Sequence, residues 1–263
     1  MKPDNLILYE RKNGIGYVTL NQPTKRNAIS FEMWQMIGNV INDCATNDSI
    51  RALLIRGAGQ VAFSAGADIS QFDENRSSKE QVVNYNSTMA TTIDILEKVA
   101  KPTIAMIHGF CIGGGLNLAV HCDLRIASNN ARFAIPAARL GLAYGLRESQ
   151  SLVQLIGPAY AKEMLYTGRQ FSATEAIDMG LINRIVAINE LENYTEKYTS
   201  LIAINAPLTI IAAKHIVRES AKDGKSQDNS MINKLVDTCF SSNDYQEGRT
   251  AFLEKRQPRF KGK

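Results

Sequence analysis

The 263-residue sequence lacks the features that mark several large classes of protein. No run approaches the roughly 18 apolar residues that a membrane span requires. Apolar residues make up 44% and charged residues 21%, a balance that excludes disordered, collagenous and low-complexity chains. The start of the chain has only a three-residue apolar run between Asp4 and Glu10, too short and too acidic for a secretory signal. We therefore expect a cytoplasmic globular protein with no membrane partner.

Cysteine and histidine are scarce. The four cysteines stand far apart without a C-x-x-C pair, which predicts buried, reduced thiols at Cys44, Cys111, Cys122 and Cys239. The three histidines show no zinc-ligand spacing, so no metal site is expected. The phosphate-binding pattern G-x-x-x-x-G-K-[ST] is also absent, which excludes that type of nucleotide loop.

The net charge of +4 arises at the C-terminal end. Residues 255–263 hold five basic side chains and no acid, whereas the rest of the chain holds 25 basic and 26 acidic residues. This segment is either a solvated tail or a cationic contact for phosphate groups of a small ligand or a nucleic acid. No interleaved aromatic and basic residues occur elsewhere, so a nucleic-acid partner is not expected.

Strand-like runs alternate with helical patterns up to about residue 187, and only helical patterns follow. The expected strands cover residues 16–20, 52–55, 103–107, 122–127 and 132–135. Ser30 is an expected N-cap for an amphipathic helix, and Ser172 with Glu175 has the spacing of a capping box. Later helices are expected at 191–204, 208–221, 231–240 and 245–255. These patterns predict an α/β core over residues 1–190 and a helical region over 191–263.

Two glycine-rich segments, Phe63–Asp68 and His108–Asn117, each follow a strand-like run. Where a strand leads into a helix through glycines, the first backbone N–H groups of the helix have no partner within it and can face an anionic ligand. Two such amides that converge form an oxyanion hole, which stabilises an enolate or alkoxide. A tight turn or close helix packing is the alternative explanation for the three consecutive glycines.

Five motifs in order along the chain resemble the crotonase superfamily, the enoyl-CoA hydratase/isomerase family. They are Leu20–Ala28 (LNQPTKRNA), Phe63–Ile69 (FSAGADI), Ile107–Leu116 (IHGFCIGGGL), Cys122–Ala127 (CDLRIA) and Tyr245–Arg256 (YQEGRTAFLEKR). The resemblance implies a spiral of β-β-α turns followed by C-terminal oligomerisation helices, in a homotrimer or in a hexamer of two trimers. It also implies a lyase or isomerase of fatty acid metabolism that acts on acyl-CoA. No tightly bound cofactor is implied, because coenzyme A is part of the substrate.

The resemblance also assigns site residues. The two oxyanion-hole amides map onto Ala67 and Gly114. The positions that bind the coenzyme A moiety map onto Lys25, Arg26, Ala28, Ala65, Asp68, Ile69, Phe252 and Lys255. The basic members of this set would lie near the phosphates, which gives the charge-skewed tail a physical role.

The sequence departs from the family where hydration needs carboxylates. Family hydratases have one glutamate three residues after the oxyanion-hole glycine and a second one twenty residues further. Counted from Gly114, these positions hold Asn117 and Ala137. Asn117 can orient a water but cannot take its proton, and Ala137 can do neither. Since each acid/base group contributes about 10² to 10⁴ in rate, standard hydration should be lost or much reduced.

Tyr144 and Glu148 are the remaining candidates, in a segment that in the family lines the acyl end of the pocket. The stretches Leu140–Tyr144 and Tyr245–Gly248 also resemble the methylmalonyl-CoA decarboxylase branch, where a tyrosine at the Tyr144 position is functional. That branch keeps a carboxylate at the Asn117 position, so the likeness is incomplete. The alternatives are a packed aromatic ring for Tyr144 and a surface ion pair for Glu148.

Three functions follow. The first, which we expect, is an enoyl-CoA hydratase or related lyase whose base is Tyr144, Glu148 or a water held by Asn117. The second is an acyl-CoA decarboxylase or isomerase that uses the same hole with Tyr144. The third is a non-catalytic acyl-CoA- or RNA-binding protein that kept the fold and lost the acids.

Overall fold

The computed structural model describes residues 6–71 and 77–263, and it contains two sheets. The large sheet has the order β1-β2-β3-β5-β7-β10 and the small one β4-β6-β8-β9. The strands of the large sheet are β1 (Ile7–Lys12), β2 (Ile15–Leu20), β3 (Ala52–Gly57), β5 (Thr103–Ile107), β7 (Leu124–Ser128) and β10 (Arg184–Val186). Those of the small sheet are β4 (Ala62–Ser64), β6 (Phe110–Ile112), β8 (Arg132–Ala134) and β9 (Phe171–Ser172).

From β3 to β8, consecutive strands alternate between the two sheets, so the chain winds as a spiral. The pairs β3–β4, β5–β6 and β7–β8 each place one strand in the large sheet and the next in the small one. Helical segments connect these turns: α3 (Lys79–Lys98), α4 (Gly114–Val120), then η4 (Pro136–Leu140) with α5 (Leu146–Thr167). Neighbouring strands are parallel except for β1 with β2 and β8 with β9. The β-β-α spiral implied by the resemblance is therefore present.

The large sheet is covered on both faces because apolar side chains alternate along its strands. In β3, Leu53 and Ile55 belong to the main core with α1 (Phe31–Thr46), whereas Leu54 packs in the cluster that includes Leu191 of α7 (Leu191–Ala203). Helix α7 thus contacts the sheet, although the sequence pattern groups it with the later helices. The division of the chain at residue 190 stays a prediction.

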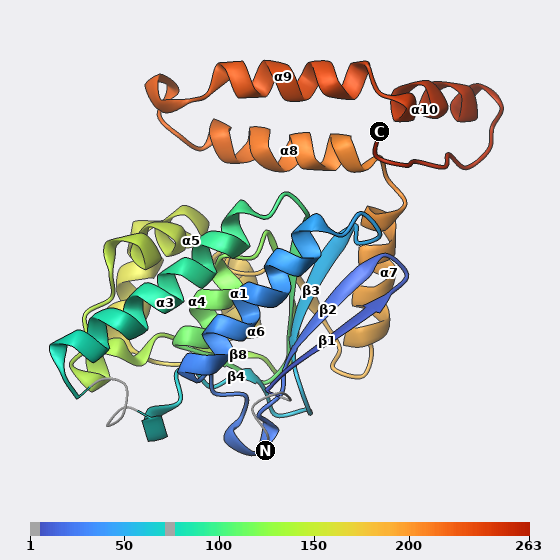
Figure 1. Cartoon of the computed structure of the whole chain (residues 1–263). Coiled ribbons are helices and arrows are strands. Elements are labelled where there is room, and N and C mark those ends of the chain that lie inside the picture. Colours follow the sequence, from blue (N-terminus) through green and yellow to red (C-terminus); the bar gives the residue numbers. More distant parts are fainter. Residues whose placement is uncertain (1–5, 72–76) are drawn as a thin grey trace.

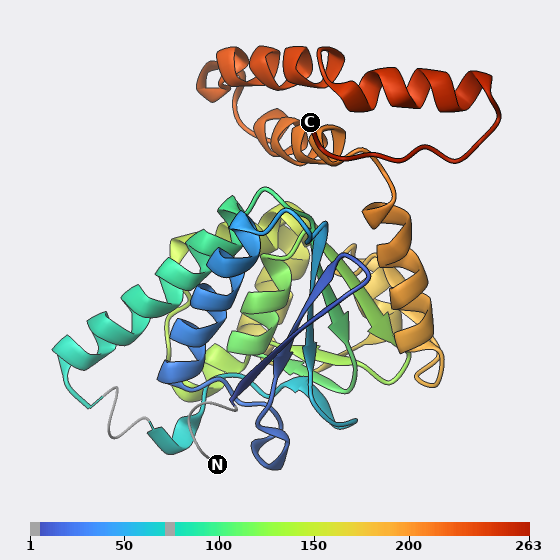
Figure 2. The same cartoon turned by 45° about the vertical axis from the view of Figure 1, so that its right-hand side comes forward.

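The last helices stand apart from the core as a separate layer. They are α8 (Pro207–Ser220), α9 (Asn229–Phe240) and α10 (Asn243–Leu253), and Figures 1 and 2 both show them stacked above the sheets. Helix α9 buries none of its residues within the chain, and Phe252 of α10 is 83% exposed. The layer therefore presents apolar side chains that the described residues do not cover.

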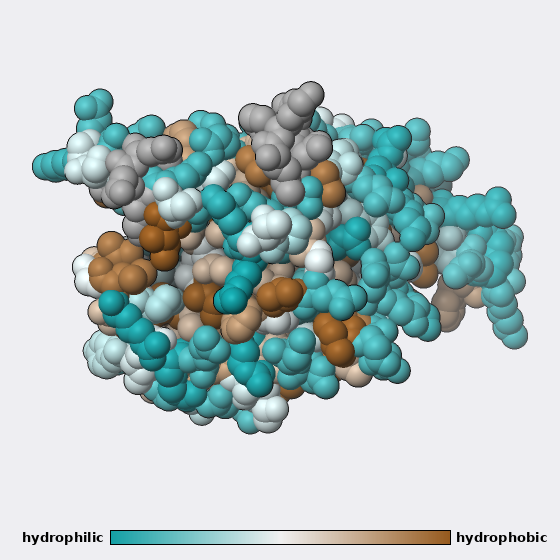
Figure 3. Space-filling view, turned by 90° about the horizontal axis from the view of Figure 1, so that it is seen from below, coloured by the Kyte–Doolittle hydropathy of each residue, from teal (hydrophilic) through white to brown (hydrophobic). Residues whose placement is uncertain are grey.

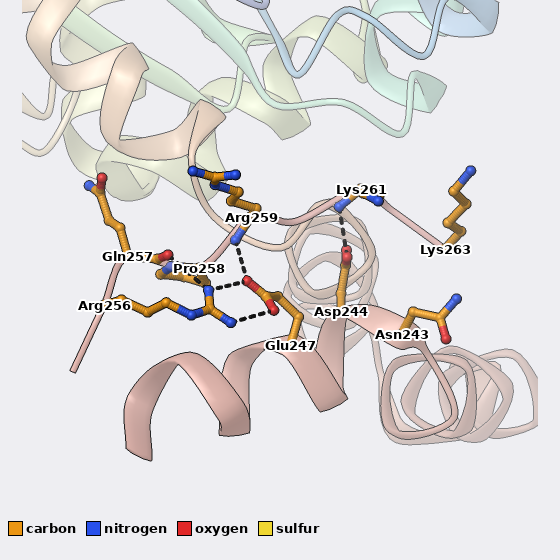
Figure 4. A pocket seen from close by; sticks show the side chains of 9 residues that line it. All are labelled: Asn243, Asp244, Glu247, Arg256, Gln257, Pro258, Arg259, Lys261 and Lys263. Atoms are coloured by element: carbon orange, nitrogen blue, oxygen red, sulfur yellow. Dashed lines mark hydrogen bonds and ion pairs between the residues drawn. The ribbon is translucent and has the colours of Figure 1, made fainter. Parts of the chain in front are cut away.

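The basic tail runs back along α10 and is attached to it. The buried Asp244 carboxylate accepts the backbone N–H groups of Lys261 and Gly262, both at 2.7 Å. Arg256 forms ion pairs with Glu247 at 2.7 Å and with Glu254 at 2.6 Å. Figure 4 shows the pocket of about 870 Å³ that this arrangement encloses. The tail is therefore bound to the helical layer along its length, and the charge of Arg256 is already paired.

Most of the expected local signals have the predicted structure. Ser30 caps α1 by accepting the N–H of Met33, and Ser172 with Glu175 forms the predicted capping box of α6 (Ala173–Asp178). The strand expected at residues 103–107 has those bounds, whereas the one expected from Cys122 begins only at Leu124. The remaining short helices are η2 (Pro23–Lys25), η3 (Ile69–Gln71) and η5 (Gly224–Ser226).

The cysteines are free thiols, three of them buried and Cys239 partly exposed. Among residues 6–71 and 77–263, no group of three His, Cys, Asp or Glu side chains is placed to hold a metal ion. No single helix in the described part of the chain is long and apolar enough to cross a membrane. The bent pair α7 and α8, at an angle of 101°, reaches that length and composition only when both helices are taken together.

Candidate active site

Two segments, Arg26–Ile29 after η2 and Ala65–Asp68 after β4, lie side by side and form a parallel bridge between Ile29 and Ala67. The N–H of Ala65 donates to the carbonyl of Arg26 at 2.9 Å, and the N–H of Ile29 donates to Gly66 at 2.7 Å. Asp68 donates back to Ile29 at 3.0 Å. These bonds hold the backbone on both sides of Ala67 while leaving the amide of Ala67 itself available.

The glycines before α4 bring a second amide next to Ala67. Gly113 has φ +51° and ψ −115°, a conformation that side chains strongly disfavour, and this turns the chain from β6 into α4. A Cβ placed on Gly114 would lie 3.5 Å from the nitrogen of Ala67, and one on Gly66 would lie 3.6 Å from the nitrogen of Gly114. The two loops are therefore in contact at the two peptide groups that the resemblance singles out.

Both amides are free to bind a ligand. Among the described residues, the N–H groups of Ala67 and Gly114 donate to no protein acceptor, and Gly114 is the first residue of α4, where no intrahelical acceptor exists. Two neighbouring N–H donors, one of them at the start of a helix, favour an oxygen that carries negative charge. This geometry can stabilise the oxyanion of an enolate.

Close packing supports this loop from behind. A Cβ on Gly115 would lie 2.6 Å from the Cβ of Ser64, so α4 approaches β4 more closely than any side chain would allow. The indole of Trp34 lies on the other side, with its Cζ2 3.6 Å from a Cβ placed on Gly114, and its Nε1 donates to Tyr85 at 3.1 Å. The support from Trp34 was not predicted, because it comes from packing that no motif records.

Lys25 and Asp68, both expected near coenzyme A, form an ion pair at 2.7 Å. Lys25 also donates to Ser70 at 2.9 Å, and Ser70 donates to Asp68 at 2.6 Å. Burial tends to raise the pKa of Asp68, but the hydrogen bonds from Lys25 and Ser70 outweigh it and keep that pKa below its usual value. The pair therefore fastens η2 to the segment that carries Ala67.

Asn27, part of the N-terminal motif Leu20–Ala28, has a structural role in the site that the sequence analysis did not predict. It adopts φ +55°, and its side-chain amide donates to the carbonyls of Ala58 and Ala62 at 2.9 and 2.8 Å while accepting the N–H of Gln22 at 3.0 Å. These bonds shape the turn that presents Ala28. Asn27 thus links the N-terminal motif to β4 and to the residues before it through side-chain hydrogen bonds.

The other predicted positions divide into two groups. Arg26 lies over the ring of Phe110 at 5.5 Å, and Ile69, directly after Asp68, is exposed. Phe252 and Lys255, by contrast, lie in and after α10. Figures 1 and 2 place α10 in the upper layer, whereas β4 and the segment after it lie at the lower end of the core. A single chain therefore does not bring all eight predicted positions together.

The two positions expected for carboxylates are neutral. Asn117 is 3% exposed; its Nδ2 lies 3.9 Å from the sulfur of Met89, and its Oδ1 has no hydrogen-bond partner among the described residues. Ala137 lies in η4 and packs against the main core. Neither residue can transfer a proton.

Tyr144 and Glu148 lie close to each other at the start of α5. Tyr144 is partly buried against the main core, and its hydroxyl has no protein hydrogen-bond partner in the described ranges. Burial, together with the nearby Glu148 and Cys111 side chains, raises the pKa of Tyr144 above its usual value. Tyr144 is therefore a protonated phenol at neutral pH, able to donate a hydrogen bond but not to act as a base.

A buried histidine, His121, ties three helices together and was not predicted as part of the site. Its Nδ1 lies 2.7 Å from the carbonyl of Asn117, so the ring donates there, and Ser151 of α5 donates to Nε2 at 3.0 Å. Glu97 of α3 lies 3.6 Å from the same Nε2. Burial lowers the pKa of His121, which therefore stays neutral and keeps α4 fixed against α5.

The surface on the side opposite the helical layer carries both hydrophobic and hydrophilic side chains. Figure 3 shows hydrophobic side chains gathered over the middle and one side of this face, within a largely hydrophilic surround. Leu146, the first residue of α5, is among the most exposed apolar residues of the described chain, at 76%. Leu140 and Leu142, which like Leu146 lie close to Tyr144 in the sequence, are also exposed.

Comparison with known proteins agrees with this geometry. A family model described as Enoyl-CoA hydratase/isomerase matches residues 10–263. A short-chain-enoyl-CoA hydratase of Clostridium acetobutylicum is 33% identical over 98% of this chain and 97% of its own length. A crotonyl-CoA hydratase of Syntrophomonas wolfei is 33% identical over 99% of both chains. A solved enoyl-CoA hydratase/carnithine racemase of Magnetospirillum magneticum superposes with a TM-score of 0.94 at 31% identity, covering 98% of this chain and 96% of that one.

The spiral of two sheets with a glycine-rich strand-to-helix loop defines the class as the crotonase fold. Within that class, the chain belongs to the enoyl-CoA hydratase/isomerase family. It is thus an enzyme of the hydratase/isomerase type, and its relatives favour this over a non-catalytic binding protein. The family match leaves the particular reaction open.

Proposed function

We propose that the protein binds an acyl-CoA and stabilises the enolate of its thioester through the amides of Ala67 and Gly114. The contact between these two peptide groups is the observation that supports the proposal most directly. As the α-carbon loses or gains a proton, negative charge develops on the thioester oxygen, and both amides bind that charge. Removal of one such donor in other enzymes costs about 2.7 to 4 kcal/mol.

The coenzyme A moiety would lie along the segments that flank Ala67, near Ala28, Ala65, Asp68 and Ile69. Because Lys25 is already paired with Asp68, we propose Arg26 as the main cation for the phosphates from this part of the chain. Coenzyme A enters and leaves with the substrate in this scheme, so no tightly bound cofactor is required.

The reaction that we propose first is hydration of a short or medium enoyl-CoA, as the names of the relatives suggest. Water must be activated at the β-carbon and a proton must reach the α-carbon, and Asn117 and Ala137 can supply neither proton transfer. Glu148 would then have to activate a water held by Asn117, because Tyr144 can donate a proton but cannot act as a base. This protein should therefore hydrate enoyl-CoA more slowly than family members that have both glutamates.

Hydration can be tested with crotonyl-CoA, whose absorbance falls as the double bond is hydrated. The matched variant is Gly114→Pro, because proline is tolerated at the first position of a helix but has no N–H to donate. We expect wild-type turnover to exceed that of Gly114→Pro by about 10² to 10³. Equal rates for both proteins, with both folded by circular dichroism, would contradict the proposal.

A second candidate, decarboxylation or double-bond isomerisation, is favoured by one observation. The site has two neutral residues where hydration needs carboxylates, next to Tyr144, a protonated phenol. Both reactions pass through the same thioester enolate and need no base to activate water. Incubation with malonyl-, methylmalonyl- and 3-enoyl-CoA, followed by chromatography and mass spectrometry, would reveal loss of CO₂ or a change in retention at constant mass.

We further propose that the enzyme is a homotrimer or a hexamer of two trimers. The helical layer exposes apolar side chains such as Phe252, Val217 and Leu253. Phe252 and Lys255 could then complete the site of a neighbouring copy, since they lie far from Ala67 in their own chain. Sedimentation equilibrium of the wild type and of Phe252→Asp tests this, with a lower mass expected for the variant.

A further inference from the structure

Isomerisation and α-proton exchange form the thioester enolate by loss of the α-proton, which needs a group to take that proton, and neither α4 nor η4 provides a carboxylate for it. The side chain of Asn117 is buried and neutral, and its Oδ1 has no partner among the described residues. Ala137 has no polar group. The proton acceptor must therefore come from another element that faces the same loop.

Glu148 is a carboxylate whose charge the protein does not neutralise. Within residues 6–71 and 77–263 it makes no ion pair and no side-chain hydrogen bond, so the surface ion pair considered for it is not formed. The neighbouring Arg147 is fully engaged, because it binds Asp94 and Glu97 of α3. Glu148 is thus available to act on a ligand.

The Glu148 side chain folds back over the start of its own helix. It is the third residue of α5, and a methyl group on Gly145, the N-cap, would overlap with its Oε2. The absence of a side chain at Gly145 therefore leaves room for this carboxylate. The position also suits a negative charge, because the first turn of a helix carries partial positive charge.

Hydrogen bonds place the first turn of α5 between α3 and α4: Arg147 donates to the carbonyl of Ala90 at 3.3 Å, and Ser151, three residues after Glu148, donates to His121 at 3.0 Å. Burial is the main cause of the raised pKa of Tyr144, and the Glu148 charge adds to it. Burial lowers the pKa of His121, and Glu148 is one of the groups that oppose this effect. Glu148 therefore lies near both Tyr144 and His121.

These neighbours place Glu148 beside the oxyanion loop. Asn117 follows Gly114 by three residues and His121 follows Asn117 by four, so the three share one face of α4 and its C-cap. On the other side, Tyr144 is near Cys111 of β6, the strand that runs directly into Gly113. Asn117 of α4 lies 3.9 Å from the sulfur of Met89, and Arg147, the residue before Glu148, donates to the next residue of α3, Ala90, at 3.3 Å. The start of α5 therefore lies level with the first turn of α4, which carries the oxyanion amide.

We infer that Glu148 is the proton-transfer residue of this enzyme, taking a proton from the α-carbon of the bound thioester and giving it back. The C–H electron pair forms the enolate double bond, the carbonyl pair moves onto the oxygen held by Ala67 and Gly114, and Glu148 becomes protonated. Return of the proton to the α-carbon gives exchange, and its delivery to the γ-carbon of a 3-enoyl thioester completes an isomerisation. Tyr144 donates a hydrogen bond in this arrangement. The inference rests on the proposed function.

The test is exchange of the α-protons of butyryl-CoA for deuterium in D₂O, followed by proton NMR, with butyryl-CoA affinity measured separately by calorimetry. The Glu148→Gln variant should lose about 10² to 10⁴ in exchange rate, because the isosteric amide cannot accept a proton, while the dissociation constant stays unchanged. The control is Glu163→Gln on the same helix, whose carboxylate pairs with Arg169 and should not influence exchange.

A second variant moves the carboxylate without removing it. Gly145 has φ −69°, so Gly145→Ala leaves the backbone unstrained and displaces only the Glu148 side chain. Its exchange rate should fall with unchanged affinity, which also keeps the inference testable if Glu148→Gln does not fold. If both variants bind butyryl-CoA and exchange its α-protons at the wild-type rate, the role of Glu148 is wrong, while the proposed oxyanion hole is unaffected. Absence of thioester binding by the wild type would overturn both.

Discussion

The two halves of the site are built from different parts of the polypeptide. The half around Ala67 and Gly114 is made by main-chain amides, held by strand pairing and by glycines whose replacement would cause overlap. The half that we propose for proton transfer consists of side chains on α4, η4 and α5, and two of its positions hold the neutral Asn117 and Ala137. A backbone feature survives substitution at most positions, whereas a side-chain feature is lost with a single residue. The comparison explains how the chain keeps the family's geometry while departing from its usual acids.

The largest effect is expected when carboxylates are introduced at the two positions where family hydratases have glutamate. The double variant Asn117→Glu with Ala137→Glu should raise hydration of crotonyl-CoA by about 10² or more, because each acid/base group contributes about 10² to 10⁴. The control is the pair Asn117→Gln with Ala137→Gln, which adds similar volume without carboxylates. If the two double variants hydrate crotonyl-CoA equally slowly, the amides of Ala67 and Gly114 do not form a functional oxyanion hole.

A large effect on stability is expected where side-chain hydrogen bonds support the backbone half. Asn27→Ala leaves one buried carbonyl, one partly buried carbonyl and one N–H without this partner and should reduce the free energy of unfolding by about 2 to 4 kcal/mol, measured by urea denaturation. Asn27→Gly tolerates the positive φ and should recover about 1 kcal/mol of that loss. Wild-type stability for Asn27→Ala would show that the loop does not need these hydrogen bonds.

A moderate, pH-dependent effect is expected at the ion pair that fastens η2. The pKa of Asp68 is lowered in the folded state, so its contribution to stability is complete above the unfolded value of about 3.9 and is lost as the pH falls through the folded value. Lys25→Met should therefore cost about 1 to 2 kcal/mol at pH 7, since Lys25 is partly exposed. The difference from the wild type should shrink below about pH 4; a difference that is constant with pH would argue against the pairing.

The smallest effect is expected at the cap of α1, the helix that carries Trp34. Ser30→Ala removes the acceptor for the N–H of Met33 and should cost about 1 kcal/mol in the urea-derived free energy of unfolding. Ser30→Asp keeps an acceptor there and should retain wild-type stability. Because Trp34 only backs the loop, butyryl-CoA affinity should stay the same in both variants.

Local signals in the sequence were sufficient for much of the fold. The caps at Ser30 and Ser172 depend on side-chain oxygens within three residues of their partners, so a short window reveals them. Helix α3 was not predicted, because it buries only four of its 20 residues and its apolar pattern is weak. Strand β1 was missed for a related reason: only Ile7 in it is buried, so it shows no alternation.

The candidate site could be predicted only as far as its motifs extend. The identities of Ala67 and Gly114 followed from ordered motifs, whereas the pairing of Lys25 with Asp68 joins residues 43 positions apart and depends on the fold. The same holds for Phe252 and Lys255, whose separation from the core arises from the placement of the helical layer. The unpartnered state of Glu148 also required the fold, since it depends on Arg147 turning to α3.

The helix start that supplies the Gly114 amide also sets a rule for redesign. A library could randomise the residues from η4 to the first turn of α5 and keep the two loops that carry Ala67 and Gly114. Its members would differ in the reaction they catalyse while binding the thioester in the same way. Clones from such a library should differ in product far more often than in their ability to retain the ligand.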